Sequence, residues 1–202
     1  MSFPEFFGVA PVIVMHDPLA GFLGAAEDGR LEYRYADAVR LAGHSCPTVA
    51  SAFLMTRAAL AALYGAALPV RGEIRVDLAE AQDAGVAGVI ASIATLITGA
   101  TAETGFKGLA GKFDRRGKLF FGQALQRGSL RFTRLDTGES AEAAADLARV
   151  PADPRIDDLL PICLRGQATT AQQQTFRNLW QERVRRLLLE HADDPQVIRV
   201  FR

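Results

Sequence analysis

Three residues at the start of a long apolar stretch have the types and spacing that metal or thiol chemistry requires. His44, Cys46 and Pro47 occur in the segment GHSCP, and a nearly continuous apolar run follows as far as Gly65. Proline suits the first turn of a helix because its missing N–H would have no partner there, so we expect Cys46 at or next to the helix N-cap. The free N–H groups and the dipole of a helix N-terminus favour a thiolate, which is both a nucleophile and a metal ligand.

A second histidine follows an apolar, β-branched stretch over residues 9–15, which predicts a buried strand. His16 and Asp17 stand at the end of this strand, where α/β proteins commonly place functional groups. A catalytic transition-metal site uses about three protein ligands and an open position. We therefore expect His16, His44 and Cys46 to be the ligands, with Asp17 as a spare ligand or as the residue that orients one of them.

The elements that must position these residues alternate between helical and strand patterns. We expect an α/β or α+β fold, in which helices pack on a mixed β-sheet and a buried apolar helix begins at the His-Ser-Cys-Pro motif. Residues 1–150 are predicted to form the core domain, and residues 151–202 a C-terminal segment that packs on the core or on a dimer partner. The individual predictions are helices over 33–41, 46–65, 86–98, 138–149 and 170–191, strands over 73–78, 129–135 and the final VIRVF, a hairpin over 113–121, and an irregular surface segment over 150–161.

Composition excludes several classes of function. Lys and Arg number 23 and Asp and Glu number 23, so the chain lacks the excess of basic residues on which nucleic-acid binding rests. Two cysteines cannot form a disulfide framework, and the N-terminus lacks the basic region of a signal peptide. The longest apolar run, over 86–100, is shorter than the ~18 residues that indicate a membrane span. We expect a cytoplasmic protein with reduced thiols.

The quoted motif also resembles a known family. GHSCP followed by an alanine-rich helix is similar to the GH-x-CPG signature of the FmdE family, which is named after a component of formylmethanofuran dehydrogenase. GVAGVIASIATLITGATAETGFKG with the later KLFF resembles that family's helix, glycine-threonine loop and following strand. The resemblance covers about residues 35–121. It implies an α/β core domain that dimerises, with a cavity that is lined by His44 and Cys46 and can hold a metal, often zinc.

This chain departs from the family pattern at several positions. Ala42 stands where the family often has a further histidine, Thr48 replaces the glycine after the proline, and Ala100 replaces a cysteine of the glycine-threonine loop. With Ala42 unable to bind a metal, His16 becomes the expected replacement ligand. The four-cysteine zinc module of some members cannot be built from two cysteines.

Three functional hypotheses follow from these residues. The first is a cytoplasmic homodimer with a zinc or other divalent transition-metal site, in which Thr98, Thr101 and Lys107 contact a small-molecule ligand in the cleft. The second is a metal-free enzyme that uses Cys46 as nucleophile and His44 as base. The third is an accessory or carrier module for a metal centre or haem. The sequence leaves open whether the protein is an enzyme, and it specifies neither substrate nor reaction.

Overall fold

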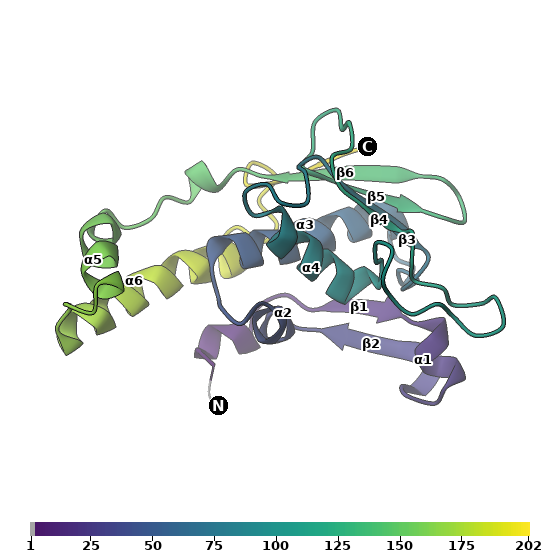
Figure 1. Cartoon of the computed structure of the whole chain (residues 1–202), viewed down its shortest axis with the longest axis horizontal. Helices are drawn as coiled ribbons and strands as arrows, with labels where there is room; N and C mark the ends of the chain where they lie inside the picture. Colours follow the sequence, from purple (N-terminus) through teal and green to yellow (C-terminus); the bar gives the residue numbers. More distant parts are fainter. Residues whose placement is uncertain (1–2) are drawn as a thin grey trace.

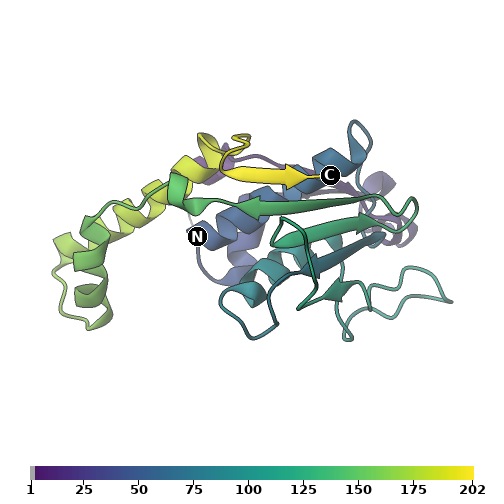
Figure 2. The ribbon, with the colours of Figure 1, turned by 90° about the horizontal axis from the view of Figure 1, so that it is seen from above.

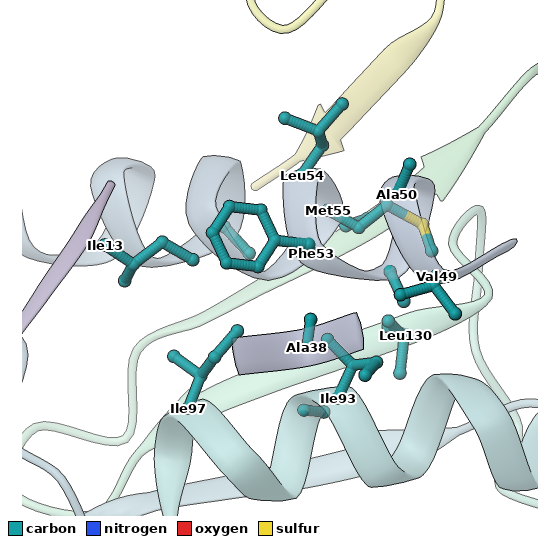
Figure 3. Close-up of a cluster of buried hydrophobic side chains, with 14 of the residues drawn as sticks. Ile13, Ala38, Val49, Ala50, Phe53, Leu54, Met55, Ile93, Ile97 and Leu130 are labelled. Atoms are coloured by element: carbon teal, nitrogen blue, oxygen red, sulfur yellow. The ribbon is translucent and has the colours of Figure 1, made fainter. Parts of the chain in front are cut away.

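The apolar run after GHSCP forms the central helix of the fold. The computed structural model describes residues 3–202, and in it α3 extends over Pro47–Tyr64, with Cys46 as its N-cap, as predicted, and Gly65 as its C-cap. Side chains are buried around most of the circumference of α3, so the helix needs packing partners on more than one side. Phe53 and Leu54 are fully buried, and Ile93 of α4 and Leu130 of β5 lie in the same apolar cluster (Figure 3).

Two separate sheets supply the strands. The larger is an open sheet in the order β4-β3-β5-β6-β7, in which only the β3–β4 pair is parallel. Its strands are β3 (Ile74–Leu78), β4 (Leu119–Phe120), β5 (Leu130–Arg134), β6 (Ser140–Ala145) and β7 (Ile198–Phe201). The smaller sheet is an antiparallel pair formed by β1 (Ile13–His16) and β2 (Arg30–Tyr33). Figure 1 shows α3 and α4 between these two sheets, so the protein has the expected α+β fold.

Short helices connect the elements of the first half of the chain. They are η1 (Glu5–Gly8), α1 (Pro18–Phe22), η2 (Glu27–Gly29) and α2 (Tyr35–Ala42), and α4 (Ala87–Thr98) follows after β3. Both α2 and α4 end at a glycine in the left-handed conformation, Gly43 and Gly99, each with φ of 74°. These endings determine where the two motif-bearing loops, at residues 43–46 and 99–118, leave the helical layer.

The C-terminal segment both joins the core and extends away from it. After η3 (Leu147–Arg149) come α5 (Arg155–Leu164) and α6 (Thr170–Leu189). The last turns of α6 bury Val184 and Leu187 in the core, and β7 pairs with β6. The first part of α6 and all of α5 protrude from the body as a two-helix arm, visible at the left of Figures 1 and 2. We refer to residues 155–180 as the arm.

Three local predictions are wrong. The alanine-rich segment predicted as a helix over 138–149 forms β6, because pairing with β5 and packing of the small Ala141 and Ala143 against the core outweigh the helix propensity of alanine. The segment over 150–161, predicted to be irregular, contains most of α5, which accommodates Pro161. The hairpin over 113–121 does not form, because β4 pairs parallel with β3 and the side chain of Arg115 is buried.

Within residues 3–202, no helix combines the length and the apolar character that crossing a membrane requires.

We predict that α3 carries much of the stability. Replacing Phe53 by alanine should lower the free energy of unfolding by about 3–5 kcal/mol, because the ring is fully buried and its removal leaves a cavity. The matched control is Phe22→Ala, since the Phe22 side chain is 69 % exposed, and its effect should stay below about 1 kcal/mol. Chemical denaturation of both variants measures the difference, and equal losses would contradict the central role of α3.

Candidate functional site at the two ends of helix α3

The cysteine of the motif is held at the helix mouth by a backbone hydrogen bond. Cys46 is 8 % exposed, and its Sγ accepts a hydrogen bond from the backbone N–H of Val49 at 3.5 Å. The thiol therefore satisfies one of the N–H groups that the first helical turn leaves without an intrahelical partner. His44 is exposed, and its Nδ1 lies 2.9 Å from the carbonyl oxygen of Ala42. The metal-free thiol hypothesis requires a hydrogen bond between His44 and Cys46. In the structure, Nδ1 of His44 instead contacts the Ala42 carbonyl oxygen, and Sγ of Cys46 accepts from the Val49 N–H.

Helix α6 fixes the position of this loop through Ser45. The indole Nε1 of Trp180 donates to the Ser45 carbonyl oxygen at 2.9 Å, and Oγ of Ser45 donates to Oε1 of Gln181 at 2.9 Å. The Tyr35 hydroxyl lies 3.0 Å from the same Oγ, and burial raises the pKa of Tyr35, so that it stays protonated. His44 and Ser45 line a groove of about 590 Å³ between the body and the arm, whose apolar lining comes mainly from Phe3, Phe7, Leu160, Leu164, Phe176 and Trp180.

A buried carboxylate that is shared by two arginines lies beside the C-terminal end of α4, on the side of the molecule away from the arm. Asp17 is 3 % exposed, and its two oxygens accept from Arg71 Nη1 at 2.9 Å and from Arg115 Nη2 at 2.7 Å. The same carboxylate caps α1 by accepting from the N–H groups of Leu19 and Ala20. Burial alone would raise the pKa of Asp17, but the Arg71 hydrogen bond and the Arg115 charge outweigh it, so the pKa is lowered. Asp17, expected as a spare metal ligand or as an orienting residue, is engaged in an ion-pair network.

His16 belongs to this side of the molecule. Its backbone N–H donates to the Pro69 carbonyl at 2.9 Å, and its carbonyl accepts from the Arg71 N–H at 2.8 Å. The ring Nδ1 lies 3.0 Å from the carbonyl oxygen of Asp28. β1 ends beside α1, on the side of the molecule away from the arm (Figure 1). His16 thus lies at the end of the molecule that is remote from the helix mouth.

One chain therefore does not assemble the three predicted metal ligands. His44 and Cys46 lie at the N-terminal end of α3, and the 18 residues of this helix span about 27 Å. Over residues 3–202, no group of three or more His, Cys, Asp or Glu side chains is arranged so that it could hold a metal ion. The separation arises because β1 runs alongside the core towards α1. Its last residue, His16, therefore lies on the side of the molecule away from the arm.

The three residues predicted to contact a ligand, Thr98, Thr101 and Lys107, lie in different surroundings. Thr98 is buried, and its Oγ1 donates to the Ala94 carbonyl oxygen at 2.8 Å and accepts from the Ala100 N–H at 3.2 Å, so it closes the end of α4. Thr101 donates to the Arg115 carbonyl oxygen at 2.8 Å and, with Arg71, lines a cavity of about 560 Å³. Lys107 is exposed and lies outside the lining of this cavity.

Sequence reasoning missed Arg71 and Arg115. The two residues are 44 positions apart, each beside ordinary loop residues, so no spacing in the sequence relates them. The sequence feature that comes closest to indicating this pair is the glycine after Arg71. A Cβ atom on Gly72 would lie 1.6 Å from Nη1 of Arg115, and a Cβ atom on Gly99 would lie 3.1 Å from it. Two glycines thus leave the space that the Arg115 guanidinium occupies.

No protein-family model, no curated protein and no solved structure matches this chain. The resemblance to the FmdE family accordingly rests on the quoted residues and stays a prediction.

We expect Gly72→Ala to destabilise the protein by displacing Arg115. The matched control is Gly138→Ala, because Gly138 also has a left-handed φ (75°, against 88° for Gly72) but has open space at the Cβ position. Both variants should lose about 1 kcal/mol through backbone strain, and Gly72→Ala should lose about 2 kcal/mol more through the broken ion-pair network. Urea denaturation compares the two, and equal losses would show that the Arg115 contact does not contribute.

We also predict a pH-dependent contribution from Asp17. Its pKa is lower in the folded than in the unfolded chain, so its stabilisation is fully present above the unfolded pKa and is lost as pH falls through the folded value. Asp17→Asn should lower the free energy of unfolding by about 3–5 kcal/mol near pH 7, because two arginines lose their buried partner. The difference in the free energy of unfolding between the wild type and this variant should stay constant down to about pH 5 and become smaller below about pH 4. Denaturant titrations across this range test the sign, and a difference that grows in acid would contradict it.

Proposed function

We propose that this protein is a homodimer that binds a transition-metal ion, zinc, at a site shared between two copies. His44 and Cys46 of one copy are the proposed ligands at the helix mouth, and His16 of the other copy is the third. The observation that carries the proposal is the hydrogen bonding of the two imidazoles: Nδ1 of His16 and Nδ1 of His44 each lie within 3.0 Å of a backbone carbonyl oxygen.

This arrangement selects one tautomer in both rings. A carbonyl oxygen can only accept, so Nδ1 must carry the hydrogen in each case, and Nε2 of the neutral ring keeps its lone pair. Metal-binding histidines characteristically donate their other ring N–H to a carbonyl or carboxylate, which orients the ring and sets the tautomer. Nδ1 of His191 makes a contact of the same kind, with the carboxylate of Asp194 at 2.9 Å, so its tautomer does not set it apart. His191 is not counted as a ligand because it follows the end of α6 and has no cysteine near it in the sequence.

The donor set suits zinc. Two imidazole nitrogens and one thiolate form a combination that zinc accepts with a fourth position open. Cys46 Sγ accepts a hydrogen bond from the Val49 N–H, which holds the sulfur at the N-terminus of α3. A zinc ion held with an open position would polarise a carbonyl group or activate a water molecule, whichever substrate it receives.

The need for a second copy follows from the distance between the two ends. A two-fold axis turns one copy end for end relative to the other, so it can place the His16 end of one chain beside the helix mouth of its partner. The groove at His44 has an apolar lining, and the arm that forms one wall leaves Leu164 79 % exposed. Apolar surface of this kind on a protruding arm is typical of a surface that another chain covers. The arm and the groove lie on the same chain, which permits the reciprocal contact of a symmetric dimer.

Metal analysis of the purified protein tests the proposal. We expect a dimer in light scattering and about one zinc per chain by elemental analysis. Cys46→Ala, His44→Ala and His16→Ala should each reduce the zinc content by at least about tenfold at limiting metal. His191→Ala is the matched control and should retain the wild-type content. A monomer, or zinc content that is unchanged in Cys46→Ala, would overturn the proposal.

Mixing of variant chains tests whether the site is shared. If the ligands come from two chains, a mixed dimer of Cys46→Ala and His16→Ala chains has one site with both defects and one intact site. Unfolding and refolding the two variants together should then restore metal to half of the mixed dimers' sites. If the three ligands came from one chain, every site would keep one defect and mixing would restore nothing.

A further inference from the structure

We propose that the arginine cluster beside the C-terminal end of α4 forms a binding site for a phosphate group. The site is a cavity of about 360 Å³ between the end of β1 and the loop over residues 111–118. It does not depend on the metal, and none of its residues is among the three proposed metal ligands.

Positive charge exceeds negative charge around Asp17. One buried carboxylate faces two guanidinium groups, Arg71 and Arg115, so the cluster holds an excess of positive charge. Arg71 is otherwise satisfied, because its Nε and Nη2 donate to the carbonyl oxygens of Ile97 and Leu96 at the C-terminal end of α4, each at 3.2 Å. Those carbonyls carry the negative end of the helix dipole and offset the Arg71 charge.

Arg115 has no such compensation. Its residue is 5 % exposed, and Nη1 is the one buried side-chain nitrogen or oxygen within residues 3–202 that has no hydrogen-bond partner. Its ion pair with Asp17 uses Nη2 only. A buried guanidinium that is only partly paired is costly. Arg115 lines the cavity, so an oxyanion bound there would offset its charge.

Lysines extend the positive charge along the cavity wall. Arg71, Lys112, Arg115 and Lys118 line it, together with the carboxylates of Glu73 and Asp114. Asp114 is paired with Arg116 at 2.7 Å, which lowers its pKa to about 2, so its charge is balanced outside the cavity. Lys118 is largely buried and donates to the Gly72 carbonyl oxygen, and its Nζ is 4.0 Å from Glu73.

These groups fit a phosphate better than a carboxylate. The cavity wall brings together a partly unpaired guanidinium and two ammonium groups, which match the charge and the several acceptor oxygens of a phosphate dianion. The phosphate can be free or the terminal group of a small phosphorylated metabolite, since both present the same acceptor oxygens.

Calorimetric titration of the whole, metal-stripped protein with inorganic phosphate tests the site. We expect saturable binding of one phosphate per chain. Lys112→Gln, an exposed change that leaves the fold intact, and Lys118→Gln should each raise Kd about tenfold. The charge-matched control is Arg165→Gln on the exposed arm, which should leave Kd unchanged. Arg115→Lys, checked for folding by circular dichroism, should also weaken binding, because an ammonium cannot replace the guanidinium fork.

Further titrations distinguish the two sources of phosphate and separate this site from the metal site. Tighter binding of glycerol 3-phosphate than of inorganic phosphate would identify a phosphorylated metabolite as the ligand, and the reverse order would identify free phosphate. No saturation by about 10 mM phosphate, tighter binding of malonate, or equal weakening in Arg165→Gln would overturn the assignment. The His16→Ala and His44→Ala variants should retain phosphate binding whatever the outcome of the zinc analysis.

Discussion

The shared carboxylate of Asp17 is the interaction on which much of the tertiary arrangement depends. It joins the end of β1 to the start of α1, and through Arg71 and Arg115 it connects them to the end of α4 and to the loop over 111–118. A buried charge is stable only where all of its partners are present at once. The segments that carry these partners must therefore take up their positions together, and the glycines at 72 and 99 leave the room they need.

Helix α3 divides the chemistry of the protein into two regions. At its N-terminal end His44 lines an apolar groove and Cys46 is the buried N-cap, and its C-terminal end lies on the side of the ion-pair network and its cationic cavity. The helix is buried along most of its surface, so it cannot bend to bring its two ends together. The proposed metal site therefore needs His16 from a second chain, whereas the proposed anion site lies within one chain. This division explains why one protein supports both a proposed shared metal site and a separate proposed anion site.

Sequence patterns predicted the elements whose burial matches their periodicity. The long apolar helix, the buried helix over 86–98, the amphipathic helix after Thr170 and the alternating strands at β3 and β5 all formed near their expected positions. The predictions failed where pairing with a distant segment decided the outcome. The alanine-rich segment over 140–145 forms a strand because β5 and β7 flank it, and residues 119–120 pair with β3 instead of folding back as a hairpin. Local propensity contains no information about such partners.

The same distinction applies to the candidate sites. The sequence by itself determined that Cys46 caps α3 and that Pro47 opens it, because capping depends on residues adjacent in the chain. Only the tertiary structure decided that His16, at the end of β1, lies on the side of the molecule away from the arm, and that Arg71 and Arg115 meet at Asp17. Those juxtapositions depend on the direction in which β1 runs and on where the loop after α4 returns. Both are consequences of how the whole chain buries its apolar surface, which no short stretch of sequence specifies.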